Sequence, residues 1–455
     1  MEYEVVIGLE IHAELSTKTK IYCGCKNSFG SEVNSQCCPI CLGMPGTLPT
    51  LNKEVVEYAI RMGHATHCTI NNVTKQDRKN YIYPDLPKAY QISQYDIPLC
   101  ENGYLDFMVD GEKKRVGITR IHIEEDAGKL IHAESFEGSL VDFNRCGVPL
   151  IEIVSEPDIR SPEEAHAYLE TIRSILLYLD ISDCKMQEGS LRCDVNVSLM
   201  PKGSDTFGTR CEMKNVNTFS GAVRAIEYEM ARQKEILDAG GVIEQETRRW
   251  NDAKGVTELL RSKEDAQDYR YFPEPDLLTF EVSEAHVQEL KDSIPELPVA
   301  KTIRYMQDFG LNQDDASLLA SNKARSEFFD SCVAMHKCDA KLVSNWVIGD
   351  IARILNERRI EIGDTALTKE NLTDMICLIE KGTISNTAAK TVLETIIGED
   401  VSPAKVVEEK GLAQVNDADA LQKIVNDVLA ANQKADVYKR QRSIRPISVC
   451  NTKKK

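Results

Sequence analysis

Residues that could perform acid–base or metal chemistry occupy alternate positions near the start of the chain. In the segment YEVVIGLEIHAEL, residues 3–15, Glu10, His12 and Glu14 fall on one face of a two-residue strand period, opposite a mostly apolar face. Two carboxylates and an imidazole on one face are costly to bury unless a cation lies among them. Taken alone, the segment is better explained as a half-exposed strand whose polar face meets water. A cation site becomes the stronger interpretation if other strands bring charged groups to the same face.

Four later segments repeat this design of one apolar and one charged strand face. They span residues 119–124, 148–154, 194–199 and 210–214. We expect a largely antiparallel sheet with one face on the core. Its other face would be a concave surface lined by Glu10, His12, Arg120, Glu124 or Glu125, Glu152, Asp194 and Lys214. Oxygen-rich sites suit Mg²⁺, which commonly carries a substrate phosphate, so this surface predicts a Mg²⁺-dependent enzyme acting on a phosphorylated or activated substrate.

A cysteine cluster follows the first strand. Cys23 and Cys25 form one close pair, and Cys38 and Cys41 form a second within the sequence CPIC. Two close pairs let four thiolates meet one tetrahedral ion, and thiols stay reduced in the cytosol, so this spacing predicts a structural zinc site. Cys37 is a fifth thiol, but Cys38 is favoured as the ligand because it completes CPIC with Cys41. The alternative is a coincidental run of buried cysteines.

Two segments rich in aromatic and basic residues could contact a ligand. Residues 75–100 interleave Tyr, Lys, Arg and Pro. Stacking by tyrosine, with charge from Lys79 or Lys88, would suit a nucleotide or an RNA end, but a surface loop whose tyrosines pack on a sheet fits equally well. Residues 269–276, YRYFPEPD, could lie over a ligand or close the sheet. The sequence leaves both alternatives open.

The composition is that of a globular protein with two or three domains. The chain has 455 residues, of which 42% are hydrophobic and 28% charged, and its formal net charge is −17. The acidic balance argues against a protein that holds nucleic acid through its overall field. We find no secretory signal and no apolar run near the roughly 20 residues that span a bilayer, so we expect a cytoplasmic protein. P-loop, Rossmann, serine-hydrolase and zinc-protease motifs are absent from the sequence.

Helical patterns interrupt the strands and then replace them. Asn52 and Ser161 are typical helix N-caps, and apolar stripes follow both. Residues 293–298, SIPELP, resemble a hinge, and beyond them only helical periodicity remains. The sequence therefore predicts an α+β fold, with a largely antiparallel sheet and a zinc knuckle followed by an all-α part.

Several long motifs in one order give a more specific indication. They include GLEIHAEL, the CGC and CPICLGMPG runs, RKNYIYPDLPKAYQISQ, IHIEEDAGK, DFNRCGVPLIEIVSEPD, GSLRCDVNVS and RCEMKNVN. Together they resemble the B subunit of the tRNA-dependent amidotransferases, the glutamyl-tRNA(Gln)/aspartyl-tRNA(Asn) amidotransferase family. The resemblance runs from about Tyr3 to about Lys434.

The resemblance implies a fold and an activity. Residues 1–292 would form a cradle domain with a kinase-type site, 293–400 a helical domain, and 401–455 a short helical tail that binds tRNA in the family. The cradle would use ATP to phosphorylate the side-chain carboxylate of glutamate or aspartate mischarged on tRNA, and ammonia would displace the phosphate. The implied partners are the amidase or A subunit, which releases ammonia from glutamine, and the small C subunit, in a heterotrimer with no membrane component.

The resemblance also implies roles for individual residues. Glu10, His12, Glu125 and Glu152 would hold Mg²⁺ at the catalytic site, although Glu124 shares the strand face and Glu125 is chosen only because the chain turns there. The zinc ligands would be Cys23, Cys25, Cys38 and Cys41. Lys79, Arg120 and Lys214 would contact phosphate or the acyl group.

The resemblance ends after about Ala435, where VYKRQRSIRP replaces the further helices of the family. We therefore expect a truncated or unrelated tail, which bears on tRNA recognition and not on the cradle. Two other functions stay open on the residues alone. One is a Mg²⁺-dependent phosphohydrolase acting on nucleic acid, and the other is a non-catalytic, zinc-stabilised RNA-binding module.

Overall fold

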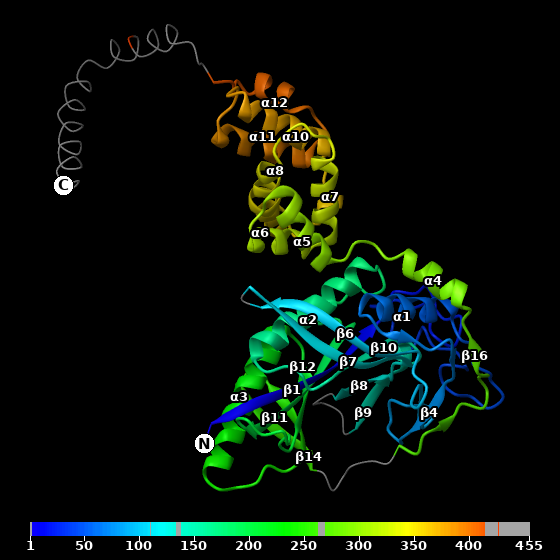
Figure 1. Ribbon diagram of the computed structural model, residues 1–455. Coiled ribbons are helices and arrows are strands. Elements are labelled where there is room, and N and C mark those ends of the chain that lie inside the picture. The colour runs from blue at the N-terminus through cyan, green and yellow to red at the C-terminus, as the bar shows by residue number, and fades with distance from the viewer. Residues whose placement is uncertain (1, 110, 133–137, 263–268, 415–425, 427–455) are drawn as a thin grey trace. The chain divides into compact units, whose positions relative to one another are not determined.

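The first strand predicted from the sequence, β1 (Tyr3–Glu14), lies inside a nine-stranded sheet (Figure 1). The structure is a computed structural model and describes residues 2–109, 111–132, 138–262, 269–414 and 426. The sheet order is β14–β13–β12–β11–β1–β10–β7–β6–β2, and only the β12–β13 pair is parallel. The other strands are β2 (Thr69–Ile70), β6 (Cys100–Val109), β7 (Glu112–Glu125), β10 (Pro149–Ser155), β11 (Leu191–Pro201), β12 (Cys211–Val216), β13 (Glu246–Asn251) and β14 (Val256–Ser262).

One face of this sheet forms the core of the first unit. The alternate residues Val5, Ile7, Leu9, Ile11 and Ala13 of β1 are all buried. Helices α1 (Lys53–Ala65), α2 (Pro162–Tyr178) and α3 (Phe219–Asp238) bury their apolar stripes with this face. The side chains of Asn52, Ser161 and Thr218 each accept a backbone N–H in the first turn of these helices. The helix caps predicted at Asn52 and Ser161 are thus confirmed.

A small sheet lies near the charged face. It consists of β4 (Asp77–Asn80), β5 (Tyr90–Ser93) and β15 (Phe272–Pro273), so the two aromatic segments of the sequence pair with each other. A bidentate ion pair fixes this pairing, because Arg78 donates to both carboxylate oxygens of Glu274 at 2.7 and 2.8 Å. The hydroxyl of Ser93 donates to Glu124 of the large sheet at 3.4 Å.

The rest of the first unit, which ends at Lys323, consists of short elements. Its remaining strands form two antiparallel pairs, β3 (Val73–Thr74) with the distant β16 (Phe280–Glu281) and β8 (Lys129–His132) with β9 (Ser139–Asp142). A 3-10 turn covers Phe143–Arg145. Its remaining helices are α4 (Glu284–Asp292), α5 (Pro298–Phe309) and α6 (Gln313–Ala320).

The second unit begins at Ala324 and is helical throughout its described part. The predicted helix at residues 340–356 is present but contains a π turn at Val347–Ile351. The helices are α7 (Lys323–Val333), α8 (Ala340–Trp346), α9 (Ala352–Arg358), α10 (Lys369–Glu380), α11 (Asn386–Gly398) and α12 (Pro403–Glu409), with a 3-10 turn at Ile362–Asp364.

The predicted α+β class, an antiparallel-rich sheet followed by helices, is confirmed. The functional boundaries at 292/293 and 400/401 stay predictions. The sequence departure expected after Ala435 lies outside the described residues. No helix among those residues is long and apolar enough to cross a membrane.

Candidate active site and metal centres

The charged face of β1 gathers acidic groups from its neighbouring strands because cross-strand partners share a face. His12 lies opposite Glu152 of β10, and Glu152 lies opposite His122 of β7. On the other side of β1, Glu10 lies opposite Asp194 of β11. The residues predicted from the alternating segments are therefore brought together by strand register.

The first group consists of His12, Glu124 and Glu152. One ligand atom from each residue lies within 4.8 Å of the others, a spacing that could hold a metal ion. The Nε2 atom of His12 is 3.3 Å from a Glu152 oxygen and 3.8 Å from a Glu124 oxygen. His122 lies behind them, with Nε2 3.6 Å from Glu152 and 3.7 Å from Glu124. One imidazole and two carboxylates offer nitrogen and oxygen donors to a divalent cation.

The electrostatics of this group favour a bound positive charge. Burial alone would lower the pKa of His12, but the hydrogen bond to Glu152 and the charges of Glu152 and Glu124 raise it to about 9. Burial would raise the pKa of Glu152, yet the charge of His122 and the hydrogen bond and charge of His12 hold it well below its usual range. The carboxylates that attract a proton to His12 would equally attract a metal ion.

A second acidic group lies next along the same face. Glu10, Asp194 and Glu212 also bring one oxygen each within 4.8 Å of one another. Lys214 pairs with two of them, at 2.6 Å from Asp194 and 2.7 Å from Glu212. Burial and the charges of Glu152, Asp194 and Glu212 raise the pKa of Glu10. The structure therefore places Glu10, which lies two residues before His12 on β1, and Lys214 with this second group.

Basic side chains also lie along this face. The buried Nε of Arg120 and Nδ1 of His122 have no hydrogen-bond partner among the described residues. Lys79 lies 4.9 Å from the ring centre of Tyr269. Burial would lower the pKa of Lys79, but the charges of Glu124, Tyr271 and Glu152 raise it. Lys79 and Arg120 are thus near the first acidic group and able to meet an anion there.

Glu125 does not join the predicted metal set. Its Oε1 accepts the Lys88 ammonium and the backbone N–H of Ile92. Alternation continues to the end of β7, so Glu124 shares the face of His122, and Glu125 points to a separate cavity of about 200 Å³ beside the cysteine cluster. We therefore replace Glu125 by Glu124 in the proposed set. The metal role of either residue stays a prediction, and the observed alternation at the end of β7 is the reason for preferring Glu124.

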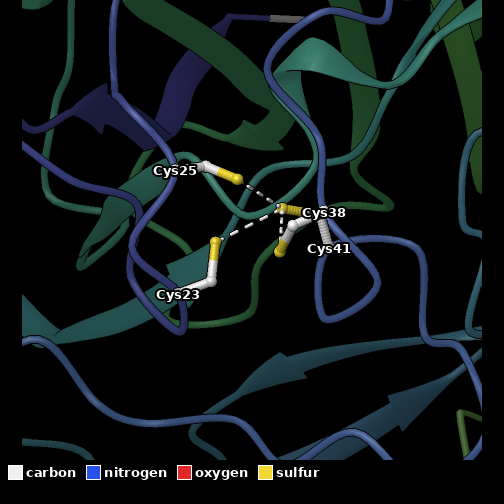
Figure 2. Close-up of side chains that lie close together, drawn as sticks. All are labelled: Cys23, Cys25, Cys38 and Cys41. Atoms are coloured by element: carbon white, nitrogen blue, oxygen red, sulfur yellow. Dashed lines mark hydrogen bonds between the residues drawn. The ribbon is translucent and has the colours of Figure 1, made fainter.

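The four predicted cysteines converge from two loops (Figure 2). The Cys41 sulfur lies 3.3 Å from that of Cys23, 3.7 Å from that of Cys38 and 3.8 Å from that of Cys25. Zinc–sulfur bonds of about 2.3 Å in a tetrahedron would place the sulfurs about 3.8 Å apart, so the cluster could hold a zinc ion. The Cys37 thiol instead donates to the Asn34 carbonyl.

Sequence reasoning missed a lysine beside this cluster. Lys20 is 1% exposed, and its ammonium donates to the Cys146 carbonyl at 2.7 Å and lies 3.6 Å from the Cys41 sulfur. The hydrogen bond with Cys23, the backbone near Cys38 and the charge of Lys20 lower the pKa of the Cys41 thiol to about 4, against the effect of burial. Its partner Cys146 is distant in the sequence, so no local pattern could have shown this contact.

A second missed cluster lies beyond His12 on the charged face. Asp126 accepts hydrogen bonds from Arg145 at 2.5 Å and from Arg192 at 2.9 Å, and Arg145 also pairs with Glu14 at 2.8 Å. Burial and the charge of Asp126 raise the pKa of Glu14 to about 7. Asp126 lies in the sequence motif IHIEEDAGK and Arg145 in DFNRCGVPLIEIVSEPD, but only the folded structure brings these two motifs together.

Comparisons with known proteins agree with this architecture. The profile described as the GatB/GatE catalytic domain matches residues 5–288, and the profile described as the GatB domain matches residues 327–444. The B subunit of the aspartyl/glutamyl-tRNA(Asn/Gln) amidotransferase of Caldicellulosiruptor bescii is 56% identical over 438 residues, which cover 96% of this chain and 91% of the relative. The B subunit of Thermoanaerobacter sp. is 55% identical (96% and 91%), and that of Clostridium botulinum is 52% identical (95% and 90%).

Proposed function

This chain belongs to the B-subunit family of the aspartyl/glutamyl-tRNA(Asn/Gln) amidotransferases, a ligase-type enzyme, and we propose that it activates the substrate carboxylate with ATP. The observation that carries this proposal is the pair of acidic groups on one sheet face beside Lys79 and Arg120. The relatives' name supplies the substrate, a glutamate or aspartate esterified to tRNA.

The proposed reaction has two steps with balanced bonds. A side-chain carboxylate oxygen of the mischarged amino acid attacks the γ-phosphorus of ATP, and the bond to ADP breaks. Ammonia then attacks the carbonyl carbon of the acyl phosphate, the carbon–oxygen bond to phosphate breaks, and the departing phosphate takes up the proton lost by the nitrogen, which leaves an amide. Lys79 and Arg120 are the proposed partners of the phosphoryl oxygens, since each is a cation close to the first acidic group.

The residues present fit a divalent cation. His12, Glu124 and Glu152 would hold one Mg²⁺, and Glu10, Asp194 and Glu212 could hold a second. The unpartnered Nε of Arg120 and Nδ1 of His122 support a site completed by a ligand, because buried polar atoms are normally hydrogen-bonded. Bound Mg²⁺ would neutralise phosphate charge and help to orient the phosphoryl group. His122, behind the first set, would position its carboxylates.

The proposed zinc site is structural. Four cysteine ligands leave no open coordination position, so Cys23, Cys25, Cys38 and Cys41 would pin two loops and take no part in the reaction. Lys20 would offset part of the negative charge of four thiolates. The proposed partners are the amidase (A) and small (C) subunits of the heterotrimer, and the proposed location is the cytoplasm.

The test is ATP-dependent conversion of Glu-tRNA(Gln) to Gln-tRNA(Gln), and of Asp-tRNA(Asn) to Asn-tRNA(Asn), with the amidase and small subunits present. Ammonium chloride and glutamine are compared as nitrogen donors. We expect amide product and one ADP per amide with at least one of the two tRNAs. RNA cleavage without amide would favour the phosphohydrolase alternative, and tRNA binding without ATP consumption would favour the non-catalytic one.

A further inference from the structure

Arg145 connects two strands of the large sheet that are not neighbours. Its Nη2 donates to Glu14 at 2.8 Å and to Asp126 at 2.5 Å, and its Nε donates to Asp126 at 3.0 Å. Glu14 ends β1 and Asp126 directly follows β7, whereas β10 lies between these two strands. Two strand spacings of about 4.8 Å each place the backbones of β1 and β7 roughly 10 Å apart. One planar guanidinium therefore ties the end of β1 to the end of β7.

The two carboxylates held by Arg145 each lie two residues beyond a proposed magnesium ligand. Glu14 follows His12 by two positions on the same face of β1. Asp126 follows Glu124 by two positions at the end of β7. The Nε2 atom of His12 lies 3.8 Å from a Glu124 oxygen, although the two strands do not pair. The tie at Arg145 is thus placed to set the separation that one metal ion would require.

The backbone just before Arg145 is held by the loop between the two cysteine pairs. Asn144 accepts the Gln36 N–H and donates to the Glu32 carbonyl, both at 2.7 Å. Asn34 forms two further hydrogen bonds to the end of β9, at 3.1 and 3.2 Å. The Asn34 carbonyl also accepts the thiol that precedes the second cysteine pair. The cysteine loop therefore holds the 3-10 turn from which the guanidinium projects.

The backbone just after Arg145 is held by the cysteine cluster itself. The Cys146 carbonyl accepts the buried Lys20 ammonium at 2.7 Å, and the same ammonium lies 3.6 Å from the Cys41 sulfur. Arg145 thus lies between two connections to the cluster, one on each side along the chain. The order of the cysteine loops and the direction of the guanidinium are coupled by these contacts.

We propose that Arg145 is a positioning residue for the first acidic group and that the cysteine cluster acts on this group through it. The inference rests on the proposed function, which assigns Mg²⁺ to the first acidic group and zinc to the cysteines. The alternative is an ion pair that only stabilises the sheet. The two differ in the sign of one effect. Removing a nearby positive charge strengthens cation binding through electrostatics alone, whereas releasing the tie moves the ligands apart and weakens it.

Replacing Arg145 should release β1 without leaving Asp126 unpaired. Arg192 donates to the other Asp126 oxygen at 2.9 Å, so the loss falls on the link to Glu14. A lysine at position 145 would keep the charge but lose the planar fork that reaches both carboxylates. Arg145→Lys therefore separates the charge of Arg145 from its geometry.

The test measures Mn²⁺ binding, from the loss of the free-ion paramagnetic resonance signal, in the complex with the amidase and small subunits. Mn²⁺ suits the same ligands as Mg²⁺. All variants carry Glu212→Gln, which removes a ligand of the second acidic group so that the first is measured alone. We expect Arg145→Gln to weaken binding about tenfold, the lower end for partners that orient metal ligands, and Arg145→Lys to weaken it less but measurably. Arg160→Gln is the matched control and should change nothing, because Arg160 pairs with Glu4 at the other end of β1.

A second arm tests the connection to the cysteine cluster. Asn144→Ala removes two hydrogen bonds to the cysteine loop without changing a proposed ligand of either metal. Its zinc content should stay at about one ion per chain, yet its Mn²⁺ binding should weaken. The double variant with Arg145→Gln should bind no more weakly than Arg145→Gln alone, since both changes act on one tie. Additive losses would overturn the coupling.

Unchanged or tighter Mn²⁺ binding in both Arg145 variants overturns the proposal, and so does equal weakening in Arg160→Gln. Should Arg145→Gln fail to fold, Arg145→Lys and Asn144→Ala carry the test. The measurement needs no turnover, so it fails separately from the proposed function. A wild-type complex that forms amide while the Arg145 variants bind Mn²⁺ normally refutes only the positioning role. Mn²⁺ binding that depends on Arg145, without amide formation by the wild type, refutes only the transamidation proposal.

Discussion

The ion pair between Arg78 and Glu274 allows an asymmetric stability prediction. It joins β4 to the segment at residues 269–276, which pairs with β4 through β15. The Glu274 side chain is fully buried, whereas the Arg78 side chain is 19% exposed. Arg78 also lies 4.1 Å over the Tyr90 ring. Removal of Arg78 therefore leaves a fully buried carboxylate, whereas a change at Glu274 leaves a guanidinium that still reaches water and the Tyr90 ring.

Arg78→Met leaves a buried carboxylate with the Asp276 N–H as its remaining contact, at 3.0 Å. We expect this variant to lose about 3–5 kcal/mol of unfolding free energy, the usual cost of leaving one member of a buried pair. Glu274→Gln keeps an acceptor for Arg78, whose guanidinium retains the Tyr90 ring and access to water. Its expected cost is smaller, about 1.5–3 kcal/mol, the net value of a hydrogen bond to a charged group. Combining Arg78→Met with Glu274→Leu should recover stability relative to Arg78→Met alone, since no buried charge remains.

Urea unfolding can be measured for the first unit alone. The chain has two tryptophans, Trp250 in the first unit and Trp346 in the second, so Trp346→Phe leaves a single fluorescent reporter. All variants are compared in that background. A Glu274→Gln cost equal to or greater than that of Arg78→Met, or a double variant less stable than Arg78→Met, would refute the reasoning.

Three further predictions concern the two metal centres and the acid range. Glu124→Gln should lower the ATP-dependent amidation rate about 100-fold or more and weaken Mg²⁺ binding, whereas Glu125→Gln should keep Mg²⁺ affinity within about twofold. Calorimetric titration with Mg²⁺ measures both affinities, and a larger loss of affinity in Glu125→Gln than in Glu124→Gln would contradict the placement of Glu124. Metal analysis should find about one zinc ion per chain. The Cys41→Ser variant should lose the zinc and have a lower unfolding midpoint than wild type. A zinc-free wild-type protein of normal stability would refute the zinc proposal. Hydrogen bonds from Arg115, with a further contribution from Lys113, lower the pKa of Asp106 to about 2, so its stabilising contribution is complete above about pH 4 and is lost as the pH falls toward 2. Arg115→Gln should weaken that acid dependence of the unfolding midpoint, and an unchanged profile would contradict the assignment.

Local periodicity was sufficient to predict the central strands and their charged face. Alternation in β1, β7, β10, β11 and β12 is strong because one side of each strand is buried and the other bears charge. Strands β6, β13 and β14 were not predicted. The edge strand β14 has no buried alternate face of comparable strength, since its Leu259 and Leu260 are both exposed.

The candidate site was predictable in its residue types and less so in its grouping. Register between strands decides that Glu10 faces Asp194 and that His12 faces Glu152, and these partners lie far away in the sequence. Lys20 and Arg192 escaped prediction for the same reason, because their partners Cys146 and Asp126 come from other parts of the chain. Whether residues 269–276 close a sheet or cover a ligand was also a question of tertiary pairing, and the segment does pair with β4.

The position of β1 has a consequence for biosynthesis. This strand is made first, yet its hydrogen-bonding partners β10 and β11 end at Ser155 and Pro201. At 5–20 residues per second, a ribosome needs roughly 10–40 s to complete β11 after starting the chain. Until β10 is made, Ile7, Leu9 and Ile11 have no neighbouring strand, and the sheet on the other side of β1 stays incomplete until β11 follows. The core of the first unit can therefore close only after about residue 201 has left the ribosome.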